Sequence, residues 1–225
     1  MMEKSRADIK QLIDLRLSAD SRIDSNNIKV KLSNSTATVS GVVHSVAAKD
    51  AVESDLWAIK EIHYVDNKLK VKFPDGYQRP ADETIKENCD RLFAIDPDLY
   101  LEDIECTVNK GVISLSGSVG QYYRKKRAEF LANQVGGAQN VRNGLSVVPT
   151  REVEDQTIAK TISHHMEKVL GREENSVVIE VQKGHVVLAG TVPDRRSFDT
   201  VEDIARYTDG VVDVKNHMSI SDGYD

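Results

Sequence analysis

The sequence predicts an α+β fold made of three tandem small αββαβ units, each a three-stranded sheet covered on one face by two helices. Two observations predict it: an internal repeat, and a regular change of hydrophobic periodicity inside each copy. Three glycines 76 and 73 residues apart anchor the repeat: Gly41, Gly117 and Gly190. An isoleucine lies 32 residues before each glycine: Ile9, Ile85 and Ile158. An asparagine lies 26 residues after each: Asn67, Asn143 and Asn216. Constant offsets on both sides of an anchor indicate three copies of one unit.

The surroundings of the asparagines and the connecting segments agree with this division. Each asparagine lies in the pattern Val-x-Asn-x-(Leu/Met)-x-(Val/Ile), as "VDNKLKV", "VRNGLSV" and "VKNHMSI". Two polar segments with turn-forming residues separate the copies, "PDGYQRPAD" at 74–82 and "PTREVEDQ" at 149–156. We therefore expect three units, at residues 3–73, 82–148 and 155–221.

Periodicity gives the first half of each unit. Apolar residues recur at spacings of three and four over 9–17, 85–93 and 158–166, which predicts a helix. Alternation follows at 28–32, 104–108 and 177–181, which predicts a strand with one buried face. A short polar turn then leads into a second alternating strand that reaches the glycine.

A second helix and a third strand complete the unit. The core positions expected for this helix are Val52, Leu56 and Ile59, then Ala128, Ala132 and Val135, then Val201 and Ala205. Ser45 and Asp194 lie at its expected N-cap, where their oxygens accept from free backbone amides. The glycine is expected at the turn from strand to helix, where its backbone freedom is useful. The asparagine is expected at the start of the third strand, bonded to its own local backbone.

Composition limits the function. The chain has 225 residues, of which 40% are hydrophobic and 29% are charged, and no run of about 18 apolar residues that could span a membrane. The start, "MMEKSRADIK", lacks the apolar core of a secretory signal. Either the protein is cytoplasmic, or an export signal lies upstream. The net charge of −6 argues against a general nucleic-acid binder. This charge is unevenly distributed, with +2 over residues 1–81, −2 over 82–152 and −6 over 153–225.

The unit resembles the BON domain, a family named for bacterial OsmY-like and nodulation proteins. The resemblance rests on the "V-x-L-x-G-x-V" and "V-x-N-x-L-x-V" patterns and covers nearly the whole chain, three times in tandem. It is strongest in "DPDLYLEDIECTVNKGVISLSGSV" and "GGAQNVRNGLSV". Unit one departs with Lys60-Glu61 in place of Gly136-Gly137, and unit three lacks the aspartate that matches Asp20 and Asp96. The resemblance implies a periplasmic or envelope-associated protein, phospholipid-surface attachment, protection against osmotic or envelope stress, and no catalysis by the domain itself.

Comparison of the copies gives no support for an enzyme. No nucleophile, paired carboxylate or histidine recurs, and "SGSVG" lacks the length and the lysine of a phosphate-binding loop. We expect no cofactor and no metal. His164 and His165 are adjacent on a helix and point about 100° apart, so an ordinary surface pair is favoured over a metal site.

The two cysteines occupy apolar positions. Cys89 aligns with Ile13 and Ile162, and Cys106 aligns with Val30 and Ile179. Buried free thiols are the plain interpretation, because a free cysteine behaves as a small hydrophobic residue. A disulfide between them is the alternative, restricted to an oxidising compartment.

The candidate binding segment is "QYYRKKR", which opens the second helix of unit two. Its site residues are Tyr122, Tyr123, Arg124, Lys125, Lys126 and Arg127. Clustered cations attract anionic lipids, and tyrosine suits a lipid interface. An anion at this helix start would also meet free backbone amides. The alternative is an ordinary solvated helix start, because consecutive residues circle the helix.

Trp57 is the only tryptophan and aligns with Asn133 and Arg206, which predicts a solvent-facing position and a contact with another unit, a partner or a membrane.

The leading hypothesis is thus a non-catalytic module that binds anionic phospholipid surfaces in the bacterial envelope, without nucleic acid as a partner. The rival is a protein-interaction, self-association or chaperone-like module that acts under stress without lipid.

Overall fold

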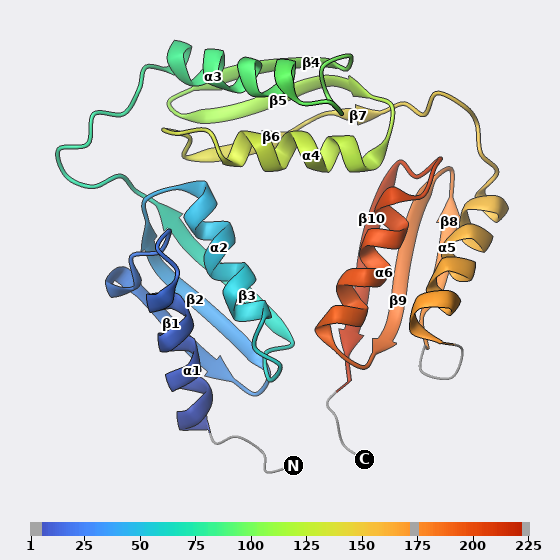
Figure 1. Ribbon diagram of the computed structural model, residues 1–225, viewed down its shortest axis with the longest axis horizontal. Helices are drawn as coiled ribbons and strands as arrows, with labels where there is room; N and C mark the ends of the chain where they lie inside the picture. The colour runs from blue at the N-terminus through green and yellow to red at the C-terminus, as the bar shows by residue number, and fades with distance from the viewer. Residues whose placement is uncertain (1–5, 172–175, 222–225) are drawn as a thin grey trace. The chain divides into compact units, whose positions relative to one another are not determined.

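The computed structural model describes residues 6–171 and 176–221 and contains three α+β repeats (Figure 1). The elements of repeat one are α1 (Arg6–Ala19), a 3₁₀ turn η1 (Ser25–Asn27), β1 (Ile28–Ser33), β2 (Thr36–Val43), α2 (Val46–Trp57) and β3 (Tyr64–Val71). Those of repeat two are α3 (Asp82–Ile95), β4 (Asp103–Asn109), β5 (Val112–Val119), α4 (Tyr122–Asn133), β6 (Asn140–Asn143) and β7 (Ser146–Val147). Those of repeat three are α5 (Asp155–Leu170), β8 (Val178–Gln182), β9 (His185–Val192), α6 (Arg195–Tyr207) and β10 (Asp213–Ile220).

The second strand of each repeat is the centre of its sheet. In repeat one, β2 pairs antiparallel with β1 and parallel with β3, and β9 does the same with β8 and β10 in repeat three. A tight turn joins the antiparallel pair, whereas the parallel pair needs a crossover, which α2 and α6 supply. This is the predicted order, and the predicted α+β class is confirmed.

Repeat two differs from the prediction in its third strand. The strand is interrupted after Asn143 and resumes as β7, which pairs parallel with the end of β5. Gly144 lies at the interruption, where repeats one and three have Lys68 and His217. The Gly144 amide still donates to the Leu115 carbonyl oxygen at 2.9 Å, so the backbone passes beside β5 without regular pairing.

Each core is formed by the inward residues of the sheet and one side of both helices. In repeat one, Val52 and Leu56 of α2 are fully buried with Ala37 and Val39 of β2. The same helix positions in repeats two and three, Ala128, Ala132, Val201 and Ala205, are also fully buried. The predicted N-caps are confirmed: Ser45 Oγ accepts from the Ala48 amide at 2.9 Å, and Asp194 from the Ser197 amide at 2.8 Å.

The prediction that the repeated glycines lie at a strand-to-helix turn is wrong. Each lies inside the second strand, where it faces the start of the first strand, as in the pair Gly41 and Ile28. The backbone there has φ of 129° at Gly41, 107° at Gly117 and 127° at Gly190. A Cβ atom at these positions would lie 2.0–2.1 Å from the carbonyl oxygen of Asn27, Asp103 or Ser176 respectively. Both the positive φ and the close approach of the neighbouring strand require glycine.

The repeated asparagines join the third strand to the second helix. Asn67 Oδ1 accepts from the Leu69 amide at 3.2 Å, the local bond that was predicted, and Asn216 does the same with Met218 at 3.0 Å. Each asparagine also donates to the helix, which the sequence did not predict: Asn67 to Glu53 Oε2 at 3.0 Å and Asn143 to the Lys125 carbonyl at 2.8 Å. Asn67 and Asn216 lie within β3 and β10, not at their first residues.

Candidate functional site

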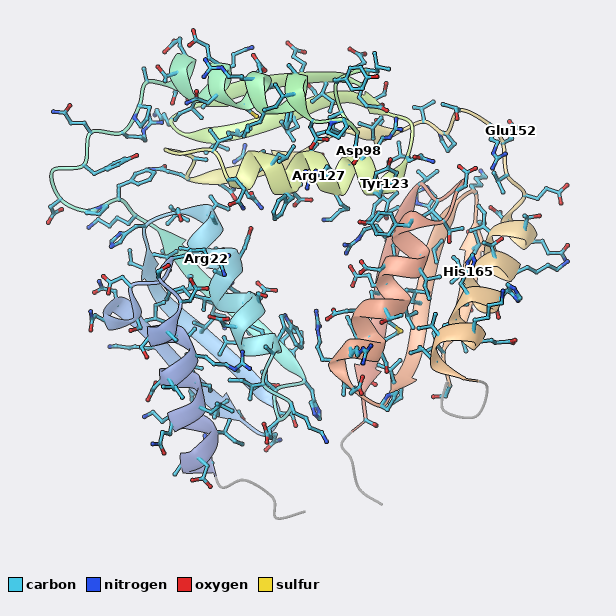
Figure 2. The ribbon with its side chains drawn as sticks, in the orientation of Figure 1. Arg22, Asp98, Tyr123, Arg127, Glu152 and His165 are labelled. Atoms are coloured by element: carbon cyan, nitrogen blue, oxygen red, sulfur yellow. The ribbon has the colours of Figure 1, made fainter. Side chains whose placement is uncertain are left out.

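The predicted binding segment opens α4, and its side chains contact the loop that precedes β4. The loop, residues 96–102, joins α3 to β4 in the same repeat, and we take Ile95, the last residue of α3, together with it. Figure 2 shows Tyr123 and Arg127 on α4 and Asp98 on the loop. Tyr123 donates from its hydroxyl to Asp98 Oδ1 at 3.2 Å, and Arg124 donates to the Tyr123 hydroxyl at 3.2 Å. The two elements are therefore held together by polar side chains.

Two arginines of the segment pair with carboxylates of the loop. Arg127 donates from Nε and a terminal nitrogen to Asp96 Oδ2 at 3.0 and 2.9 Å. Asp96 is 6% exposed, so this guanidinium neutralises an almost buried carboxylate. Arg124 forms an ion pair with Glu102, whose other oxygen accepts from the Gly120 amide at 2.9 Å. Hydrogen bonds with Tyr123 and then Glu102 raise the pKa of Arg124 above its ordinary value.

The remaining residues of the segment are partly occupied as well. Lys126 pairs with Glu129 at 2.7 Å on the same helix. Lys125 is half-buried, and its carbonyl accepts the bond from Asn143. Tyr122 is half-buried, and burial raises the pKa of its phenol. Three of the four cations thus pair with carboxylates, Arg124 with Glu102, Lys126 with Glu129 and Arg127 with Asp96, so the local surface carries little net charge.

The loop itself exposes three large apolar side chains. Ile95, Tyr100 and Leu101 are 73%, 59% and 80% exposed, whereas Leu99 between them is buried. We call these three residues the apolar trio. The loop backbone is folded on itself, since the Leu99 and Tyr100 amides both donate to the Asp96 carbonyl at 3.1 Å. Apolar side chains that a fixed loop exposes to water are unfavourably solvated and add nothing to the core. Such a cluster is typical of a surface that contacts a partner.

The apolar trio is specific to repeat two. The matching residues are Ala19, Asp24 and Ser25 in repeat one, and Lys168, Glu173 and Glu174 in repeat three. Sequence reasoning missed the trio because it compared the copies for what they share. The signal was the large apolar residues in "AIDPDLYLED" at positions where the other copies have alanine or polar residues.

A groove lies beside the trio. It has a volume of about 220 Å³ and is lined by Asp90, Phe93, Ala94, Leu99, Tyr100, Glu102 and Ile104. Its walls come from the end of α3, the loop and the start of β4. The lining mixes apolar side chains with polar atoms, which include the carboxylates of Asp90 and Glu102.

A recurring glutamate was also missed by the sequence reasoning. Glu53, Glu129 and Glu202 each lie 14 residues before the repeated asparagine. Glu53 and Glu202 accept from Asn67 and Asn216 at 3.0 Å, so the position stabilises the contact between the second helix and the third strand. The recurrence is therefore explained by the fold.

Trp57 does not occupy the solvent-facing position that its alignment predicted. It is the last residue of α2, is half-buried, and packs against the core of its own repeat. An indole is large enough to extend from a helix end over neighbouring core side chains while its edge remains wet. Alignment with polar residues in the sister units could not show this.

The other candidates have plain structural roles. Cys89 and Cys106 are both buried and are not joined in a disulfide, so of the two interpretations of the cysteines the buried thiols hold. His164 and His165 are exposed on α5 with ring centroids 5.9 Å apart. Within residues 6–171 and 176–221, no three His, Cys, Asp or Glu side chains come together as a metal site. Over the same ranges, no helix combines the length and the apolar character needed to cross a membrane.

Three sheet-and-helix repeats, one of them with a distinct polar and apolar surface, define a tandem α+β domain protein with a candidate binding surface on its second repeat. The chain belongs to the BON domain family, whose model matches residues 5–72, 81–149 and 154–222. It is 31% identical over 122 residues to osmotically-inducible protein Y of Escherichia coli strain K12. That match covers 52% of this chain and 61% of the relative, so the chain spans less than two thirds of the relative's length.

Two solved structures of CdsD, a structural protein of the type III secretion system of Chlamydia trachomatis, also align with the chain. One, of the C-terminal domain, is 15% identical and covers 96% of this chain and 98% of its own, with a TM-score of 0.26. The other is 14% identical and covers 95% and 92%, with a TM-score of 0.26.

Proposed function

We propose that this protein is a non-catalytic component of the bacterial cell envelope that attaches to anionic phospholipid surfaces and protects the envelope under osmotic stress. Membership of the BON domain family and the similarity to a protein named for its osmotic induction support the stress role. The observation that carries the attachment is the apolar trio, three exposed side chains on a loop that ion pairs hold in place.

The trio supplies the favourable energy of attachment. Full burial of one Leu, Ile or aromatic side chain contributes about 1.5–3 kcal/mol relative to exposure. Three side chains that enter the interfacial region of a bilayer together therefore contribute several kcal/mol. Because contacts with α4 already order the loop, little further entropy is lost on attachment.

The role of the basic segment changes in this account. Arg124 and Arg127 position the loop through Glu102 and Asp96, so their charges are largely neutralised before any lipid is present. Attachment by repeat two is consequently driven by the apolar trio, and cations at Lys125 and Lys126 make the smaller contribution.

Vesicle co-sedimentation of the full chain tests this function. We expect Ile95→Ser with Leu101→Ser to weaken binding to vesicles that contain phosphatidylglycerol by roughly ten- to a hundredfold, since two aliphatic side chains that would be partly buried at the bilayer interface are lost. The matched control is Leu15→Ser with Val169→Ser, which removes two exposed apolar side chains from α1 and α5. The control should bind like the unchanged protein. Equal losses in both variants, or no binding by the unchanged protein, would contradict the proposal.

The groove beside the trio favours a second candidate, a protein-interaction or chaperone-like module. A groove of about 220 Å³ with both apolar and polar walls fits one large side chain of a partner protein. This candidate gains if the protein suppresses aggregation of an unfolding client in the absence of lipid, and if the Ile95 and Leu101 variant loses that activity while vesicle binding is absent.

A further inference from the structure

The open face of the sheet in repeat one carries a cluster of lysines. Along β1 and β3 the inward side chains pack on the helices, and the alternate residues point to the opposite face. Four of these outward residues are exposed lysines: Lys29, Lys31, Lys68 and Lys70. We call these four residues the lysine face. The outward positions of β2 between them include Thr38 and Ser40, which carry hydroxyl groups, and Val42.

Strand pairing sets the dimensions of the lysine face. Ser40 of β2 pairs with Lys29 on one side and Lys68 on the other, so these two lysines lie in one row across the sheet. Neighbouring strands are about 4.8 Å apart, which separates the ends of that row by about 10 Å. Lys31 lies opposite Thr38 and Lys70 opposite Val42, so each is about 7 Å from that row, in opposite directions along the sheet. The four ammonium groups therefore extend from one broad, shallow surface.

The charge of this face is almost all of one sign. The three strands of repeat one contain one acidic residue, Asp66, which pairs with Lys68 at 2.7 Å. The strands of repeat two contain Asp103 and Glu105 with one cation, Arg142, and those of repeat three contain Glu180 and Asp213 with one lysine. The strands of repeat one thus carry a net positive charge, whereas the strands of repeats two and three carry a net negative charge.

Protection of sheet edges does not explain the difference. Lysines on edge strands discourage pairing with another chain, and β1 and β3 are both edge strands. However, the positions that match Lys29 and Lys31 are Glu105 and Thr107 in repeat two, and Val178 and Glu180 in repeat three. Repeats two and three thus have the same edge strands without these lysines. Protection of the edges therefore does not account for the lysines of repeat one.

We propose that the lysine face binds the phosphate groups of an anionic phospholipid surface. The inference rests on the proposed attachment to phospholipid and supplies the electrostatic part that repeat two lacks. Lysine is a mobile point charge that suits many phosphates spread over a surface, whereas one bound anion calls for a fixed, bidentate site. Single-stranded nucleic acid is less well matched, because stacking of bases needs aromatic side chains, and Tyr64 is the one aromatic residue in these three strands.

Neutralisation of the four lysines in the full chain tests the inference. Lys29→Gln, Lys31→Gln, Lys68→Gln and Lys70→Gln are combined in one variant. The matched control combines Lys10→Gln, Lys60→Gln, Lys160→Gln and Lys168→Gln, which removes the same charge from exposed positions off the strands. Binding is measured to phosphatidylcholine vesicles with and without phosphatidylglycerol. Since all eight side chains are exposed, both variants should keep the circular dichroism and the thermal transition of the unchanged protein.

We expect Lys29, Lys31 and Lys70 each to contribute about fivefold to binding of the anionic vesicles, Lys68 less because it pairs with Asp66, and all four together on the order of a hundredfold. The control variant should change binding by no more than a few fold. The inference is overturned if the lysine-face variant binds anionic vesicles as tightly as the unchanged protein. It is also overturned if the control variant loses as much affinity as the lysine-face variant. Tighter binding of a short single-stranded oligonucleotide than of anionic vesicles also overturns it, as does a change in oligomeric state that accounts for the loss.

The outcomes separate this inference from the proposed function. If the lysine-face variant binds anionic vesicles normally while Ile95→Ser with Leu101→Ser does not, the function stands and the inference fails. If the unchanged protein binds no vesicle, both fail.

Discussion

Repeat one and repeat two are built on one fold and present different surfaces. Repeat one exposes four lysines on its open sheet face, and its loop after α1 is polar. Repeat two has Glu105 and Thr107 in place of two of those lysines, and instead exposes the apolar trio on the loop after α3. In the proposed attachment both surfaces act on anionic lipid, the lysines by attracting its charge and the apolar side chains by leaving water. A membrane attachment that needs two weak signals would use both.

The difference shows how to separate structural from functional positions within a repeat protein. Residues that recur, such as Gly117 and Asn143, make backbone contacts that the fold requires. Residues that do not recur, such as Leu101 and Lys29, are exposed and leave the core unchanged. Arg127 is the instructive exception, because it occurs in one repeat and is nonetheless structural. Substitutions of both kinds test this division.

The largest effect on stability is expected at the recurring glycine. Gly117→Ala should cost about 3 kcal/mol or more, because φ is positive and the new Cβ would overlap the Asp103 carbonyl oxygen. Amide hydrogen exchange of β5 in the full chain measures the loss of protection. The control is Gly136→Ala, whose Cβ would meet no atom within 4 Å. Equal protection in the two variants would mean that the glycine recurs for a reason other than strand contact.

The next largest loss of stability is expected at Arg127, which occurs in one repeat but has a structural role. Arg127→Met should destabilise repeat two by about 3 kcal/mol, because it leaves the nearly buried Asp96 carboxylate without its cation. Lys125→Met removes the same charge from a neighbouring position and should change stability by less than about 0.5 kcal/mol. Hydrogen exchange of α3 and β5 reports both. If Lys125→Met were as damaging as Arg127→Met, the segment would act through its total charge and not through the loop.

A smaller effect is expected at the recurring asparagine. Asn67→Ala removes the bonds to Glu53 and to the Leu69 amide and should cost about 1–2 kcal/mol. Trp57 is the only tryptophan and packs on the core of repeat one, so its fluorescence in a urea titration follows this repeat alone. Ser40→Ala, on the open face of the same sheet, is the control and should shift the midpoint little. An equal shift in both would refute a special role for the asparagine.

The smallest effect depends on pH. Asp155 accepts from the Gly184 and Lys183 amides at 2.8 and 2.7 Å, and these bonds lower the pKa of its carboxyl from 3.8. Because the folded-state pKa is the lower one, the stabilisation is present above pH 3.8 and is lost as the pH falls through the folded-state pKa. Asp155→Asn should therefore lower the thermal transition of repeat three near neutral pH and have no effect in strong acid. A difference that persists or grows in acid would contradict this assignment.

Much of the fold could be predicted from the sequence because its determinants are local. Periodicity gave the order of helices and strands, and constant offsets from the glycines gave the repeat. The place of Gly41 could not be predicted, since the close approach of the Asn27 carbonyl is a contact between strands. Likewise, Gly144 looked like any residue of a strand, although the third strand of repeat two is interrupted there.

The candidate site could be predicted only in part. The sequence singled out Tyr122–Arg127, but the partners of Arg124 and Arg127 lie 22 and 31 residues away in the chain, so their neutralisation needed the fold. The apolar trio and the lysine face were both visible as residues in which one repeat departs from the others. Their exposure follows from the positions of the strands and the loop, which sequence alone leaves open.

The division of attachment between two repeats is the central claim, and the salt dependence of vesicle binding tests it most directly. Screening shortens the Debye length from about 10 Å at 0.1 M salt to about 3 Å at 1 M, so it weakens attraction by lysines and spares apolar contacts. For the unchanged protein, affinity for phosphatidylglycerol vesicles should fall with salt to a plateau. The lysine-face variant should begin near that plateau and stay flat, whereas Ile95→Ser with Leu101→Ser should keep the slope at lower affinity. A lysine-face variant that retains the full salt slope would contradict the account.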